Sequence, residues 1–178
     1  MSVLAIQKLQ RRFGEAILAT HSNLGDDTVV VRRESLLEIA QFLKDDPELV
    51  FDMPVDNTAV DFWQERELRF EVIWHFYSTQ KHARIRLKVL LGEDDPSCAS
   101  LCLLWPGFNW HERETWDMYG IRFSGHPNLK RVLMYEEFVG FPLRKDYPIT
   151  KRQPLVQERL VRDVPTQRNP PPDMLNRP

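Results

Sequence analysis

Cysteine is nearly absent from this chain: there are two among 178 residues, Cys98 and Cys102. They lie four positions apart in a stretch that is predicted to be helical, which is a poor geometry for a disulfide. Two cysteines are also too few for a small secreted scaffold held together by disulfides. The sequence therefore favours a reducing compartment.

The sequence also lacks any apolar run long enough to span a membrane, and it begins with neither an apolar leader nor an Arg-rich transit segment. A strongly basic composition is missing too, since the formal net charge is -2. Non-specific binding to nucleic acid usually needs a broad basic surface. We therefore expect no membrane anchor in this chain and no nucleic-acid partner.

Several short motifs that mark common enzyme classes are absent as well. The chain contains no Gly-x-Gly-x-x-Gly fingerprint, no Walker loop and no Gly-x-Ser-x-Gly elbow. These motifs position phosphates at helix N-termini or place a nucleophilic serine on a sharp turn. Their absence removes the usual nucleotide-binding and acyl-transfer interpretations.

The composition changes towards the C-terminus, which suggests a domain at 1–144 and a tail at 145–178. Seven of the thirteen prolines lie in the tail, which also holds seven Lys or Arg and four Asp or Glu. Its net charge is therefore +3, and the preceding residues carry -5. A proline-rich tail with no core of its own is either solvated or ordered by lying along a partner.

Two segments carry apolar residues at every second position, with mostly polar residues between them, which is typical of half-buried strands. They lie at 68–78 and 83–91, and the short polar link between them predicts an antiparallel hairpin with one polar face or edge. Shorter strands are expected at 16–20, 28–31, 49–53 and 58–62, with a turn over 22–27.

Helices are expected in four places, each with a sequence signal at its start or end. One runs over 3–13, and another follows a Ser35–Glu38 capping box and has an apolar face up to Leu43, before Asp45-Asp46-Pro47. A third should open at Asp95-Pro96 and reach Trp105, and a fourth should run from a cap at Asn109 to Gly120. Together these elements predict an α+β domain with a mixed or mainly antiparallel sheet, helices packed on one side, and an extended proline-rich C-terminal tail.

Four charged residues crowd into the last helix: Glu112, Arg113, Glu114 and Asp117. Paired carboxylates suit general acid and base catalysis, so a free-standing carboxylate-dependent hydrolase is one alternative. However, Arg113 and Asp117 are spaced to pair on the helix surface. The Glu112 side chain could also reach back to the backbone N–H of the capping residue Asn109. The spacing favours structural ion pairing over catalysis.

A metal site built from Cys98, Cys102 and His111 is a weaker alternative. Zinc sites usually draw on closely spaced pairs of ligands, and iron-sulfur clusters need a larger set of cysteines. Small thiols on the inner face of a helix more often pack in the core. We therefore expect no bound metal or cofactor in this chain.

The stretch from Glu112 to Leu133 closely resembles the signature of the 30 kDa subunit family of respiratory complex I, whose bacterial members are lettered C. In the signature, Glu-Arg-Glu is followed by an acidic residue, two apolar residues, a spaced His or Lys, a basic residue and two apolar residues. The later segment Phe141–Pro148, Phe-Pro-Leu-Arg-Lys-Asp-Tyr-Pro, is also similar to that family. The likeness is sharp over 105–148 and weak over the first sixty residues.

The resemblance implies a non-catalytic structural subunit in the peripheral arm of a proton-pumping NADH:quinone oxidoreductase. FMN, iron-sulfur clusters, NADH and quinone would then belong to the complex, and the partners would be the large subunit that forms the quinone site and the neighbouring iron-sulfur subunits. The expected location is the cytoplasmic side of a bacterial inner membrane, or the matrix side for an organellar chain. A membrane-bound hydrogenase subunit, or a ferredoxin- or deazaflavin-linked relative, is the alternative within this class. The residues that the resemblance marks as interface or signature positions are Glu112, Arg113, Glu114, Asp117, His126, Lys130, Arg144, Asp146 and Tyr147.

Overall fold

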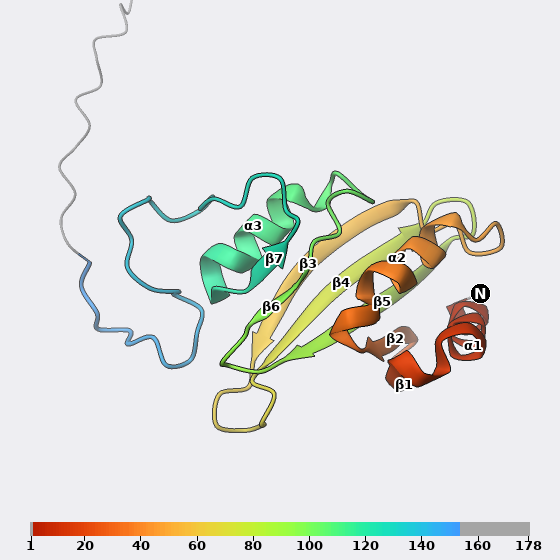
Figure 1. Cartoon of the computed structure of the whole chain (residues 1–178), viewed down its shortest axis with the longest axis horizontal. Coiled ribbons are helices and arrows are strands. Elements are labelled where there is room, and N and C mark those ends of the chain that lie inside the picture. Colours follow the sequence, from red (N-terminus) through yellow and green to blue (C-terminus); the bar gives the residue numbers. More distant parts are fainter. Residues whose placement is uncertain (1, 154–178) are drawn as a thin grey trace, which may run out of the picture.

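A five-stranded sheet with helices on one face forms the body of the chain in the computed structural model, which describes residues 2–153 (Figure 1). No helix within that range is long and apolar enough to cross a membrane. The elements in chain order are α1 (Ser2–Phe13), β1 (Ile17–Asn23), β2 (Asp26–Val31), α2 (Leu36–Asp45), β3 (Met53–Asp61), β4 (Phe70–Ser78), β5 (Ala83–Leu91), β6 (Ser97–Ala99), α3 (Phe108–Tyr119) and β7 (Arg122–Ser124).

The strand order in the main sheet is β1-β2-β5-β4-β3. All neighbours are antiparallel except β2 and β5, which run parallel. The β1–β2 hairpin turns at Leu24 and Gly25, which have φ values of 55° and 85°. Positive φ at both central residues is the geometry that matches the twist of a tight hairpin. The α+β fold with a mixed sheet is confirmed.

The core lies on the face of β4 that carries Phe70, Val72, Trp74 and Phe76. Each of these residues is paired across to an apolar residue of β5, as the alternating pattern predicts. Buried residues of α1, α2 and α3 join the same cluster, so the helices cover one face of the sheet. The opposite face is less open than a half-buried strand implies, since Glu71 and Ile73 are also buried and Glu71 forms an ion pair with Lys88.

The helix predicted from Asp95 to Trp105 is wrong. Residues Ser97–Ala99 form β6 instead, which pairs in parallel with β7. The backbone N–H of Ser100 continues this pairing by donating to Ser124 O at 2.9 Å. A partner strand far along the chain has therefore overridden the local helix signal. Cys98 and Cys102 are both buried free thiols.

Three smaller expectations also need correction. The strand predicted at 49–53 does not form, since residues 49–52 lie in a turn and loop, and the strand predicted at 58–62 is part of the longer β3, which begins at Met53 and has a register shift next to Pro54. Because β3 is an edge strand, it tolerates a residue that lacks an N–H. Ser35 precedes α2 but makes no side-chain capping bond. Helix α3 begins at Phe108 after Gly107, so Asn109 is not its cap.

Residues 125–153, called here the clasp segment, follow β7 without forming a helix or a strand. Gly120 ends α3 with φ +76°, and a Cβ at this position would lie 2.5 Å from the Phe141 ring. Only glycine fits both the left-handed backbone and this close approach. The end of α3 is thus shaped to receive the clasp segment.

Candidate functional site

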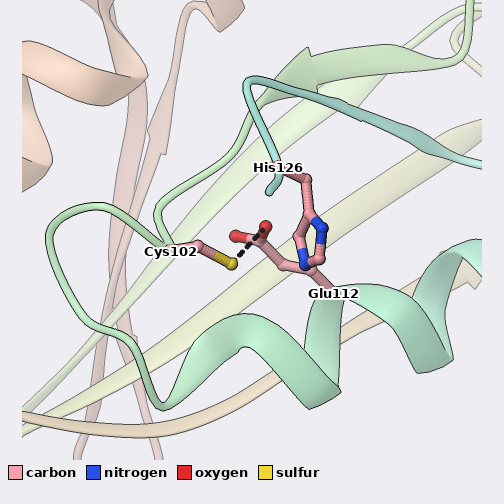
Figure 2. A group of neighbouring side chains, drawn as sticks. All are labelled: Cys102, Glu112 and His126. Atoms are coloured by element: carbon pink, nitrogen blue, oxygen red, sulfur yellow. Dashed lines mark hydrogen bonds between the residues drawn. The ribbon is translucent and has the colours of Figure 1, made fainter. Parts of the chain in front are cut away.

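Glu112 points from α3 into the interior and has no exposed surface (Figure 2). Its carboxylate accepts hydrogen bonds from Ser100 Oγ at 2.6 Å, from the Leu101 backbone N–H at 2.8 Å and from Cys102 Sγ at 3.3 Å. Burial raises the pKa of this carboxyl group above its ordinary value, although the donors act in the other direction. Glu112 does not reach back to cap α3. It fixes the turn that follows β6.

His126 lies next to this carboxylate, and ligand atoms of Cys102, Glu112 and His126 are all within 4.8 Å of one another. The backbone N–H of Asn128 donates to His126 Nδ1 at 3.0 Å, so Nε2 carries the proton and donates to Asn109 O at 3.1 Å. Neither ring nitrogen is left to bind a metal ion.

Burial raises the pKa of the Cys102 thiol to about 12, so this side chain is a neutral donor to Glu112. Burial likewise raises the pKa of Cys98. His111, the third member of the predicted metal set, lies elsewhere, with Nδ1 3.2 Å from a carboxylate oxygen of Asp56. The arrangement is a hydrogen-bonded packing cluster, and it does not bring together Cys98, Cys102 and His111 as ligands.

Asp117 is the second fully buried carboxylate of α3. One of its oxygens accepts the backbone N–H groups of Val132, Leu133 and Met134 at 2.9 to 3.0 Å. The other forms an ion pair with Arg131. Burial opposes ionisation, but these donors outweigh it and lower the pKa of Asp117. The side chain therefore holds the beginning of the clasp segment against the helix.

The spacing predicts an ion pair between Arg113 and Asp117, but Asp117 pairs with Arg131 instead. The guanidinium of Arg113 donates to the carbonyl oxygens of Lys130 and Arg131 at 3.1 and 3.2 Å and lies over the Trp110 ring. Arg131 in turn donates to Phe138 O and Gly140 O, so one chain of contacts runs from α3 into the clasp segment.

The other signature positions on or near α3 differ in exposure. Glu114 and the Lys130 side chain are exposed. Glu112 and Asp117 are closed to solvent, so the three acids of this helix do not converge on a surface that a substrate could reach. A candidate general base must come within hydrogen-bonding distance of its substrate. The geometry disfavours a hydrolase site here.

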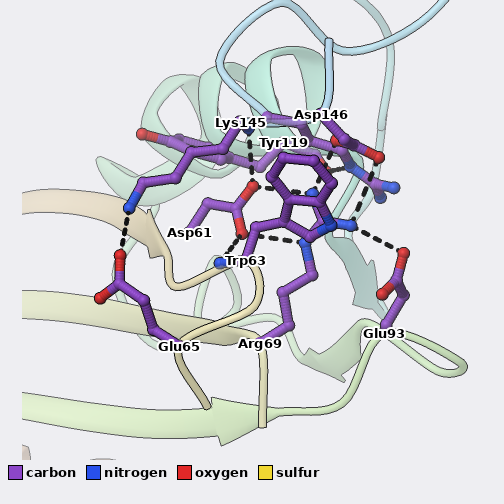
Figure 3. Close-up of polar contacts among 9 residues, drawn as sticks. Asp61, Trp63, Glu65, Arg69, Glu93, Tyr119, Lys145 and Asp146 are labelled. Carbon is purple, nitrogen blue, oxygen red and sulfur yellow. Dashed lines mark hydrogen bonds and ion pairs between the residues drawn. The ribbon is translucent and has the colours of Figure 1, made fainter. Parts of the chain in front are cut away.

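Sequence reasoning missed a second charged cluster, which is centred on Arg69 (Figure 3). This side chain is 3% exposed and forms ion pairs with Asp61 at 2.8 Å, Glu93 at 2.7 Å and Asp146 at 2.7 Å. The Lys145 backbone N–H also donates to Asp61 at 2.8 Å. Hydrogen bonds, first to Asp61, raise the pKa of Arg69, and Arg69 in turn lowers the pKa of Asp146.

Arg144 and Tyr147 complete the attachment of the clasp segment. Arg144 donates to Tyr119 O, and its guanidinium lies over the rings of Phe70 and Phe141. Burial, followed by the charge of Arg69, lowers the pKa of Arg144. Tyr147 stacks on Phe138. Arg144 and Asp146 thus attach the clasp segment to the helix and the sheet, and Tyr147 packs within the segment itself. Residues 154–178 of the predicted tail lie outside the described residues.

The raised pKa of Glu112 predicts a pH dependence of stability. The unfolded chain releases this proton near the ordinary value of 4.5, whereas the folded chain releases it at higher pH. Between the two values the folded chain binds more protons, so the contribution of Glu112 to stability falls as pH rises. We expect the stability of Glu112→Gln relative to wild type to increase over this window, as measured by urea unfolding at a series of pH values. Exposed Glu114→Gln is the matched control, and a pH-independent difference at Glu112 would refute the prediction.

Comparison with known families finds a match that includes the residues of both charged clusters. A family model described as "Respiratory-chain NADH dehydrogenase, 30 Kd subunit" matches residues 29–153. A protein named as the C subunit of NADH-quinone oxidoreductase from a Roseiflexus species is 48% identical over 144 residues, covering 81% of this chain and 82% of the relative. The protein of the same name from Rhodobacter capsulatus is 46% identical over 162 residues, covering 89% and 80%.

Two solved structures share the fold. One is described as a trypsin-resistant fragment, 1–134, of Nqo5, with a TM-score of 0.61 and 27% identity, covering 72% of this chain and 100% of the fragment. The other belongs to a membrane-bound sulfane sulfur reductase described as an archaeal respiratory membrane complex, with a TM-score of 0.66 and 17% identity, covering 84% and 86%. The second likeness concerns the fold alone.

Proposed function

The chain belongs to the 30 kDa subunit family of respiratory-chain NADH dehydrogenases, and from this premise we propose that it is a non-catalytic structural subunit of the peripheral arm of complex I. In that role it supports electron transfer from NADH to quinone, coupled to proton translocation, without supplying a reacting group. FMN, the iron-sulfur clusters, NADH and quinone bind to other subunits of the complex.

One observation carries the non-catalytic role. The buried acids of the family signature have donors from their own chain, and these bonds hold loops in place. Buried polar groups in folded proteins are hydrogen-bonded, and structural networks perturb carboxylates as active sites do, so buried acids with such donors support a structural role. The signature thus marks the attachment of the clasp segment to α3.

The proposed partners are the large subunit that forms the quinone site and the iron-sulfur subunits beside it. In this proposal the chain is held at the membrane through these partners. The proposed location is the cytoplasmic face of a bacterial inner membrane, or the matrix face in an organelle. Identity of 45% and 48% to two proteins named as the C subunit of NADH-quinone oxidoreductase favours this assembly over a hydrogenase-type relative.

Affinity purification of the tagged full-length chain from its native membranes in mild detergent tests this proposal. We expect subunits of the NADH, iron-sulfur and quinone modules to be recovered by mass spectrometry, together with NADH:quinone activity. Recovery of a nickel-binding large subunit instead would assign the chain to a hydrogenase. A soluble monomer without companions would overturn the proposal altogether.

A further inference from the structure

We infer that the clasp segment, residues 125–153, is a docking surface for a neighbouring subunit that presents an apolar patch with an acidic rim. This inference rests on the proposed function, because it requires that the chain work inside an assembly. It goes further by assigning the contact to one part of the surface. The signature helix α3 lies beneath that part and anchors it.

The first argument is how the segment is held. Long irregular segments within a compact domain are uncommon and usually functional, since ordering them costs conformational entropy. Here the ordering comes from two ion pairs that each have one nearly inaccessible member, namely Asp117 with Arg131 and Arg69 with Asp146. The fold thus fixes the shape of a surface that has no secondary structure of its own. Figure 1 shows it as an arch at the end of the molecule away from α1 and α2.

The second argument is what the segment presents to solvent. Its charged anchors point inward, while large apolar side chains along it are left exposed. A surface hollow of about 220 Å³ also opens between Gly140, Arg144 and Tyr147. Interfaces are commonly anchored by an apolar side chain of one partner seated in such a pocket of the other. The exposed apolar residues are Leu133, Tyr135, Val139, Leu143 and Ile149.

The third argument identifies the chemistry of the occupant. Lys151 and Arg152 are exposed beside these apolar residues, and residues 145–178 hold seven Lys or Arg against four Asp or Glu. Gln153, the last described residue, donates to Val139 O at 3.0 Å. A partner that covers this face meets both its apolar side chains and the exposed Lys151 and Arg152, which calls for an apolar centre and an acidic rim.

Cysteine protection tests the inference directly, because both native thiols are buried and Leu143 is 53% exposed. We expect Leu143→Cys to react with N-ethylmaleimide in the isolated full-length chain and to react at least about tenfold more slowly in the purified assembly, as a desolvated interface requires. Leu24→Cys is the matched control, since Leu24 is fully exposed on the β1–β2 turn, away from the clasp segment. It should react equally fast in both states.

Each outcome separates the inference from the proposed function. Equal labelling of Leu143→Cys in the free and assembled chain would overturn the docking surface and leave subunit membership intact. Failure of the wild-type chain to recover any companion would overturn the proposed function itself. Should Leu143→Cys fail to fold, Val139→Cys probes the same face and is read in the same way.

Discussion

Replacing Asp117 with alanine is expected to lower the free energy of unfolding by about 3–5 kcal/mol, the usual cost of removing one partner of a buried ion pair. The loss has two sources. The guanidinium of Arg131 keeps its partly buried position without its counter-charge. Three backbone N–H groups at the start of the clasp segment also lose their common acceptor.

Urea unfolding of the purified chain measures this loss, and trypsin digestion shows where it acts. Because Asp117 holds the clasp segment, cleavage at Lys145 and Lys151 should accelerate before the sheet becomes accessible. Glu114→Ala is the control on the same helix, and its exposed side chain should change stability by no more than about 0.5 kcal/mol. Equal effects of the two variants would mean that Asp117 has no special structural role.

The alternating pattern of β4 and β5 was enough to predict their pairing. A strand that buries one face has apolar residues at every second position, and this repeat is visible in the sequence. The stretch at Ser97–Ala99 was not predictable in this way. Its local cap and proline signals favour a helix, and only the distant strand β7 makes the extended form more stable. Local propensity is a weak guide where tertiary pairing competes with it.

The signature helix shows the same limit at the level of side chains. Three residues of α3 break the usual rule that acids are exposed and aromatics are buried, since Glu112 and Asp117 are inaccessible and Trp110 is 65% exposed. The helical period gives the direction of each side chain around the helix axis. It does not show whether hydrogen-bond donors in the protein interior can satisfy a buried carboxylate. The family resemblance marked these residues, and only the structure shows that Glu112 and Asp117 face inward.

The Arg69 cluster has no local sequence signal at all. Its carboxylates come from the end of β3, the loop after β5 and the clasp segment, so they lie far apart along the chain. The cluster joins the edge of the sheet to the Arg-Lys-Asp-Tyr motif. The clasp segment is thus fixed at two places, near its start by Asp117 and near its end by Arg69.

Arg69→Met is the complementary test of this second attachment, and we expect it to lower the free energy of unfolding by about 3–5 kcal/mol, because a nearly inaccessible Asp61 loses its counter-charge. Arg69→Lys should recover only part of the loss, since a point charge cannot replace a planar fork that contacts three carboxylates. Urea unfolding of the three proteins gives this ranking.

The three carboxylates that pair with Arg69 should contribute unequally to stability, because Asp61 is buried and the other two are partly exposed. Asp146 and Glu93 have side chains that are 39% and 58% exposed, so Asp146→Asn or Glu93→Gln should cost about 1 kcal/mol or less. The double variant Asp61→Asn, Arg69→Met should be less destabilised than the sum of its single changes, because no buried charge is then left unpaired. Additive losses would instead show that the Asp61 and Arg69 side chains contribute independently and do not act as a buried pair.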